Sequence, residues 1–186
     1  LVRDRAQFGK VTISADNVVL WGLTIRGGLF YGGKSQNYVW RSWLRANTGD
    51  VVSNNGAERD CDLAYCDVTG AKDVGGINFG KIGPQFARVS IRRNYIHDLV
   101  RVSNTAAQAF SFGNGRNDDN TLGTITMDAG GSTIQENLFK EIHLAQSVKI
   151  RCGGVIIAYN TFDKTVDSAP ENRFGKGNQW IGNIFS

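Results

Sequence analysis

The segment GVIIAYNTF (residues 154–162) is repeated, with changes, on both sides of itself in the chain. The segment STIQENLF (132–139) precedes it, and NQWIGNIF (178–185) follows it. In each copy an apolar residue is followed by two spacers, an asparagine, one spacer and a phenylalanine. The three asparagines, Asn137, Asn160 and Asn183, are 23 residues apart. A fixed period of this length is typical of repeat proteins, in which each repeat stacks on the next.

The same pattern continues toward the N-terminus in weaker form. With the asparagine as position zero, apolar side chains recur three residues before it and two residues after it. Seven copies have their zero position at Leu23, Ser42, Cys66, Asn94, Asn137, Asn160 and Asn183, with spacings of 19, 24, 28, 43, 23 and 23 residues. A step of 43 residues is long enough for two coils. We therefore expect an additional coil there, with its pattern obscured by the polar segment 113–123.

Apolar pairs also recur 12 and 10 residues before the zero position. They are Val11 and Ile13, Ile125 and Met127, and Val148 and Ile150. Alternation of this kind predicts short strands, separated by turns rich in Gly, Asn and Asp. One turn of chain per repeat then predicts an all-β fold, a single-stranded right-handed parallel β-helix of roughly eight coils of about 23 residues.

We interpret residues 1–186 as one such domain. Bare ends of a β-helix expose a strand edge and need a cap, so we expect a fragment or a part of a larger chain or assembly. Within the domain, asparagines at one position are expected to hydrogen bond from coil to coil at a spacing of about 4.8 Å. Phe139, Phe162 and Phe185 are expected to form an internal row, and Cys66 to pack at an asparagine position.

Composition points to the kind of partner. The net charge is +4 and the pI about 9.1, which favours an anionic partner. The three cysteines form no CxxC pair, which argues against a zinc site or a disulfide scaffold. No segment reads as a membrane-spanning helix or as a signal peptide. We expect an anionic polysaccharide as partner, with no nucleic acid and no membrane span.

A patch of cations is predicted on one outer face. If Val148 and Ile150 point inward, the residues that alternate with them point outward. The predicted patch contains the catalytic candidates Lys149, Arg151 and Arg173 and the substrate-binding candidates Asp128, Asn172 and Lys176. Three or four cations on about two coils predict a groove for a polyanion such as a uronic-acid polysaccharide. A surface charge ladder without function is the alternative.

The run from Val148 to Phe185 resembles the core of family 6 polysaccharide lyases, the group of chondroitinase B and alginate lyases. The resemblance implies a right-handed β-helix that cleaves its substrate by β-elimination. Arg151 falls at the position of the family's catalytic lysine, and Arg173 at the position of its catalytic arginine. Phe174 replaces the histidine that follows in the family, and Gly175 is retained.

The sequence departs from that family at its calcium site. The family carries two acidic calcium ligands five and seven residues before the base, where this chain has Gln146 and Leu144. No cofactor is therefore predicted, and calcium is implied by the resemblance alone. Arginine stays protonated and is a poor base, so Lys149, on the same face as Arg151, is the other candidate for that role.

These observations predict an extracellular or periplasmic lyase, or one on a virion surface, that cleaves acidic polysaccharides. β-Elimination needs a group that neutralises the uronate carboxylate, a base for the C5 proton and an acid for the departing O4. Arg173 or Lys176 would neutralise the carboxylate, and Lys149 or Arg151 would act as base.

Two alternatives belong to other classes. A glycoside hydrolase needs two carboxylates across the scissile bond, and Asp128 has no obvious partner. A phage tailspike or adhesin would use the same β-helix to bind surface polysaccharide, with or without depolymerising it. A homo-oligomer is compatible with that alternative.

Overall fold

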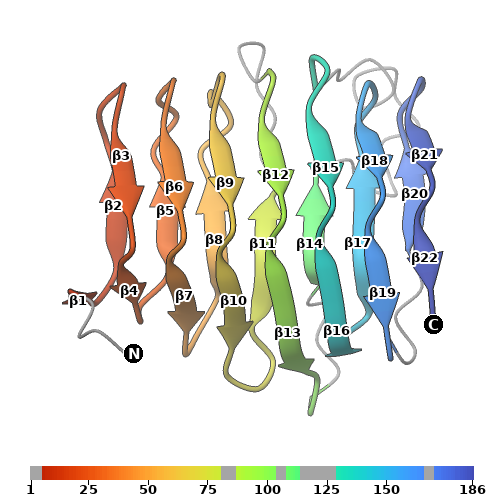
Figure 1. The fold of residues 1–186 in the computed structure, drawn as a ribbon, viewed down its shortest axis with the longest axis horizontal. Helices are drawn as coiled ribbons and strands as arrows, with labels where there is room; N and C mark the ends of the chain where they lie inside the picture. The colour runs from red at the N-terminus through yellow and green to blue at the C-terminus, as the bar shows by residue number, and fades with distance from the viewer. Residues whose placement is uncertain (1–5, 81–86, 104–107, 114–128, 166–169) are drawn as a thin grey trace.

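The structure is a computed structural model that describes residues 6–80, 87–103, 108–113, 129–165 and 170–186. All regular elements in these ranges are β-strands, which form three sheets of parallel strands. Figure 1 shows the coils side by side along one axis, from the N-terminus at one end to the C-terminus at the other. The predicted all-β parallel β-helix is confirmed.

Each coil contributes one strand to each sheet. Sheet A contains β1 (Gln7–Phe8), β4 (Thr24–Ile25), β7 (Trp43–Ala46), β10 (Asp67–Gly70), β13 (Tyr95–Val100), β16 (Leu138–His143), β19 (Thr161–Asp163) and β22 (Ile184–Phe185). Sheet B contains β2 (Val11–Ile13), β5 (Leu29–Tyr31), β8 (Asp50–Asn54), β11 (Gly75–Phe79), β14 (Gln108–Phe112), β17 (Gln146–Arg151) and β20 (Glu171–Phe174). Sheet C contains β3 (Val19–Trp21), β6 (Tyr38–Trp40), β9 (Asp62–Ala64), β12 (Ser90–Arg92), β15 (Thr133–Gln135), β18 (Ile156–Ala158) and β21 (Gln179–Ile181).

The 43-residue step is a single coil, which corrects the expectation of two. Strand β12 pairs directly with β15, and β13 pairs directly with β16. The expected strand around Ile125 and Met127 lies outside the described residues. In sheet B the neighbour of β17 is β14, which places Phe110 beside Val148 and Phe112 beside Ile150.

The predicted apolar positions form the core. The apolar residues at position −3 relative to the zero position stack along sheet C. The apolar residues at position +2 stack along sheet A. The rings of Phe139 and Phe162 are stacked with centroids 4.8 Å apart, and the same distance separates Phe162 from Phe185. The stacking expected from the sequence is therefore confirmed along the solenoid axis, and the row is internal at Phe139 and Phe162, whereas Phe185 is 57% exposed.

The asparagine ladder is also confirmed. The Nδ2 group of Asn94 donates to Oδ1 of Asn137 at 3.0 Å, and Asn137 and Asn160 repeat this bond one coil further on. Each Oδ1 also accepts the backbone N–H of the preceding ladder residue, as Asn94 does from Cys66. Cys66 is buried at its ladder position, and all three cysteines are free thiols.

The residue just before each ladder position has a left-handed backbone. Its φ lies between 50° and 66° in all seven coils, at Gly22, Arg41, Tyr65, Arg93, Glu136, Tyr159 and Gly182. This conformation turns the chain from sheet C into sheet A within two residues. Only two of the seven residues are glycines, although glycine is the residue that adopts this conformation without steric strain.

Candidate functional site

Lys149 lies on the outer face of sheet B, as its sequence position predicts, but it is only 4% exposed. Its amino group lies 3.4 Å from Oε1 of Gln146 and 3.8 Å from Oε2 of Glu171. Glu171 is its neighbour on the next coil, and Ser111 its neighbour on the previous one. The lysine is thus held by polar side chains of its own sheet.

In a regular 23-residue repeat, Lys149 and Arg151 would pair with Asn172 and Phe174, and the structure shows only the second of these pairs. Arg151 does pair with Phe174, but Lys149 pairs with Glu171, and Asn172 lies beside the inward-pointing Ile150. A register shift between Ile150 and Arg151 separates the two pairs. Because the shift inserts one residue on β20, it moves Asn172 away from Lys149 and brings Glu171 into its place.

Of the predicted site residues beyond β17, the structure describes the side chains of Asn172 and Lys176. Asn172 is exposed and its Oδ1 accepts a hydrogen bond from Asn178 at 2.8 Å. Lys176 lies in the following turn, where it is exposed. The backbone of Arg173 belongs to β20, but its side chain lies outside the described structure, as does the whole of Asp128.

The positions of the absent calcium ligands have structural roles. Leu144 is fully buried in the core, and Gln146 begins β17 and accepts from Lys149. Within the part of the chain that the structure describes, no group of three or more His, Cys, Asp and Glu residues is arranged to hold a metal ion.

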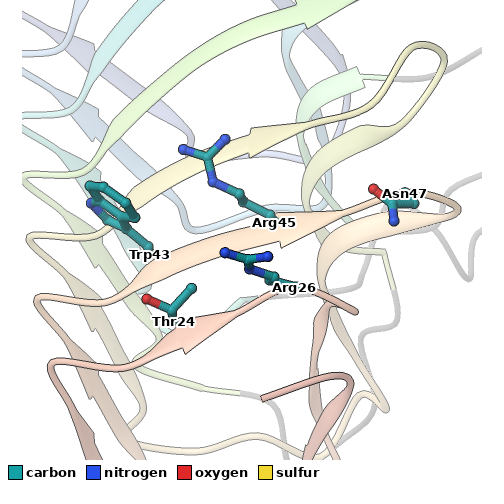
Figure 2. A pocket seen from close by; sticks show the side chains of 5 residues that line it. All are labelled: Thr24, Arg26, Trp43, Arg45 and Asn47. Carbon is teal, nitrogen blue, oxygen red and sulfur yellow. The ribbon is translucent and has the colours of Figure 1, made fainter. Parts of the chain in front are cut away.

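A second candidate site, which the sequence did not predict, lies on the outer face of sheet A. It is a cavity of about 450 Å³, and Figure 2 shows the five side chains that line it: Thr24, Arg26, Trp43, Arg45 and Asn47. We call it the Arg–Trp pocket. In this pocket the cationic side chains of Arg26 and Arg45 lie beside Trp43, which is 40% exposed.

Strand pairing brings the two arginines of the Arg–Trp pocket together. Thr24 pairs with Trp43 and Ile25 with Leu44, so Arg26 and Arg45, the next residues, project from neighbouring coils. Figure 2 shows both side chains extending toward the side on which Trp43 lies. The Arg45 guanidinium lies 5.5 Å from the Trp43 ring centroid, a cation–π contact within one strand.

A smaller cavity of about 200 Å³ adjoins the Arg–Trp pocket. It shares Arg45 and Asn47 with the pocket and is completed by Ala46 and by Thr69, Gly70 and Ala71 of the next coil. Asp67, on the same strand as Thr69, lies 4.0 Å from Arg45 and 3.1 Å from Nε2 of His97. The charge on the outer face of sheet A therefore changes sign between the coil of Arg45 and the coil of Asp67.

A third cationic surface, at the turn from sheet C to sheet A, is engaged in contacts of its own. Arg41 lies over the rings of Trp21 and Tyr65, at 5.1 and 5.9 Å from their centroids. Arg93 hydrogen bonds to the Tyr65 hydroxyl and to the Glu136 carboxylate. These side chains link successive coils, which favours a structural role for this column.

Sequence reasoning missed the Arg–Trp pocket because its parts are 19 residues apart in the chain. Trp43 and Arg45 lie in one aromatic-rich segment, whereas Arg26 belongs to the preceding coil. The available signal was the register itself, since Thr24 and Trp43 both follow their zero position by one residue.

Comparisons with known proteins add no assignment: no family model, no curated protein and no solved structure matches this chain. The resemblance to family 6 polysaccharide lyases therefore remains a prediction from the sequence. No helix in the described ranges is long and apolar enough to cross a membrane.

Proposed function

We propose that this protein binds an acidic polysaccharide on the outer face of its β-helix. The observation that carries the proposal is the Arg–Trp pocket, where Arg26 and Arg45 from neighbouring coils lie beside the exposed ring of Trp43. The net charge of +4 agrees with an anionic partner.

The chemistry of these side chains matches an acidic sugar. The flat apolar face of an indole packs against the apolar face of a sugar ring. A guanidinium is a permanent cation that binds a carboxylate or sulfate through two parallel hydrogen bonds. Thr24 and Asn47 add groups that can hydrogen bond to sugar hydroxyls.

Calorimetric titration with chondroitin, alginate and polygalacturonate oligosaccharides tests the proposal. We expect Arg45→Ala to weaken binding about tenfold or more, because a hydrogen bond to a charged group contributes about 1.5–3 kcal/mol. Trp43→Ala should weaken it as well. Arg88→Ala is the matched control, because it removes the same charge at an exposed position that is paired with Asp60. Equal losses in all three variants, or no binding of any polymer, would contradict the proposal.

Cleavage of the polysaccharide by β-elimination is the second candidate. It is favoured by Lys149, which lies on the outer face of sheet B, as the alternation of side chains predicts, and on the same strand as Arg151. To act as base, its amino group would have to leave Glu171 and Gln146 and reach the substrate. Arg151, on the same strand, would neutralise the uronate carboxylate.

Absorbance near 235 nm, which reports the unsaturated product, tests this reaction on the same polymers with and without calcium. We expect a rise with wild type and none with Lys149→Ala. A Lys164→Ala variant, which loses an exposed lysine paired with Glu141, should behave as wild type. A flat trace from folded wild-type protein that binds the polymers would exclude the lyase reaction and leave binding alone.

A further inference from the structure

We infer that the preferred ligand of the Arg–Trp pocket is a polysaccharide in which acidic and neutral sugars alternate, lying along the solenoid axis. This inference rests on the proposed function. It goes further by specifying how charged and neutral sugars are arranged along the bound polymer. It is drawn from the outer residues of three successive strands of sheet A, β4, β7 and β10.

Charge is distributed unevenly over these three coils. The first contributes Arg26 and the second contributes Arg45, so both cations border the Arg–Trp pocket. The third contributes Asp67 and Thr69, which are in register with Trp43 and Arg45. A ligand that crosses the coils along the two arginines therefore meets Thr69 next, with the Asp67 carboxylate two residues away in the row of Trp43.

The smaller cavity beyond Arg45 suits an uncharged sugar. Its lining adds no further cation to Arg45, and its remaining side chains are Ala46, Asn47, Thr69 and Ala71, with Gly70 between the last two. Asn47 and Thr69 can exchange hydrogen bonds with hydroxyl or amide groups. The small side chain of Ala71, which is exposed, leaves room for a ring.

The two cavities share Arg45 and Asn47, so one ligand can occupy both. Neighbouring coils are about 4.8 Å apart, and three coils thus span about 10 Å along the solenoid. A chain that fills both cavities runs across the strands, with its acidic sugar between Arg26 and Arg45 and its next sugar over the third coil.

Asp67 discriminates against a polymer with an acid on every residue. A second carboxylate over Thr69 would lie on the same outer face as the Asp67 carboxylate, two residues away on β10, and the lining adds no cation to Arg45. Like charges in contact disfavour binding. A neutral sugar at this place meets no such repulsion.

The experiment compares oligosaccharides of equal length in calorimetric titrations at one ionic strength. Hyaluronan and unsulfated chondroitin fragments carry one carboxylate on every second sugar, and oligogalacturonate carries one on every sugar. We expect the better of the two alternating fragments to bind at least tenfold more tightly than oligogalacturonate. Equal binding, or tighter binding of oligogalacturonate, would overturn the inference while leaving the proposed function intact.

Two variants separate the effect of the Asp67 charge on polymer preference from the effect of the size of the smaller cavity. Asp67→Asn should strengthen the binding of oligogalacturonate and so reduce severalfold the ratio of the affinity for the alternating fragments to that for oligogalacturonate. Asp163→Asn is its matched control, because Asp163 lies on the same outer face, paired with Lys140 at 3.8 Å, and should leave the preference unchanged. Ala71→Phe, which fills the smaller cavity, should reduce the affinity for a tetrasaccharide to that for a disaccharide.

The outcomes separate failure of polysaccharide binding from failure of the preference for an alternating polymer. If no acidic oligosaccharide binds to folded protein, the proposed function fails. If acidic oligosaccharides bind, but Asp67→Asn leaves the preference unchanged or Ala71→Phe leaves the length dependence intact, only the alternating-polymer inference fails.

Discussion

The side-chain amide of Asn137 donates from Nδ2 to Oδ1 of Asn160, one coil further along the solenoid, at 3.0 Å. The same Nδ2 also donates to the carbonyl of Ile91 at 2.9 Å, and Oδ1 accepts from both the backbone and the side chain of Asn94. One buried amide thus ties together three coils. Its bonds replace those to water, because the amide is only 1% exposed.

We expect Asn137→Ala to lower the free energy of unfolding by about 3–5 kcal/mol. The substitution leaves several buried polar groups without partners, and each such group destabilises by about 1–3 kcal/mol. Urea unfolding followed by circular dichroism measures the change. Asn47→Ala, at an exposed position, is the control and should change stability by less than about 0.5 kcal/mol. Similar values for both variants would show that the ladder is not a main source of stability.

We expect Phe162→Ala to destabilise the fold by about 3–5 kcal/mol, since it leaves a cavity in the middle of the phenylalanine row. Phe162 is fully buried between two stacked rings. Phe185→Ala provides the comparison at the same register, because Phe185 is 57% exposed and buries less surface. The urea midpoint should fall much further for Phe162→Ala, and a larger effect at Phe185 would contradict the core described above.

Tyr159 tests the left-handed turn position. Its φ is 55°, and its side chain is 61% exposed, so backbone conformation should dominate the effect of small substitutions. We expect Tyr159→Gly to be more stable than Tyr159→Ala by about 1 kcal/mol. At Thr161, in the following strand, the order should reverse, because glycine weakens a strand. Thermal unfolding of the four variants measures both differences, and alanine being preferred at both positions would refute the strain argument.

The buried thiols should be unreactive in the folded protein. Burial raises the pKa of Cys61 to about 11 and that of Cys66 to about 12. Because the thiolate is the reactive form, Ellman's reagent at pH 8 should label neither residue in the native state, and should label all three cysteines in urea. Rapid labelling of the native protein would indicate that the coils open readily.

The same shift predicts a loss of stability in alkali. The folded state holds the Cys66 proton more tightly than the unfolded chain, whose thiol has a pKa near 9.0. The stabilising contribution of the protonated Cys66 thiol to the free energy of unfolding is therefore fully present below pH 9. It decreases between pH 9 and about 12, by about 1.4 kcal/mol for each pH unit. Urea midpoints at pH 7 and 10.5 should differ more for wild type than for Cys66→Ser. Ser42 shows that serine suits a ladder position, since its hydroxyl accepts from the backbone of Leu23.

The candidate site was predictable only in part. Lys149 was placed on the correct outer face, because side chains alternate strictly along a strand. Its partner Glu171 was not predicted, because the register shift between Ile150 and Arg151 leaves no mark in the sequence. The Arg–Trp pocket was missed, since Arg26 and Arg45 meet only when the coils are stacked.

By itself, the sequence determined the repeat and the core. In the last three copies the asparagine and phenylalanine positions recur every 23 residues, and a period is a local property that needs no knowledge of distant contacts. Only the tertiary structure decided that the 43-residue step is one coil, that Tyr159 and its equivalents are left-handed, and that Arg26 lies beside Arg45. These facts depend on which strands pair, and pairing is set by the free energy of stacking whole coils, which no single segment encodes.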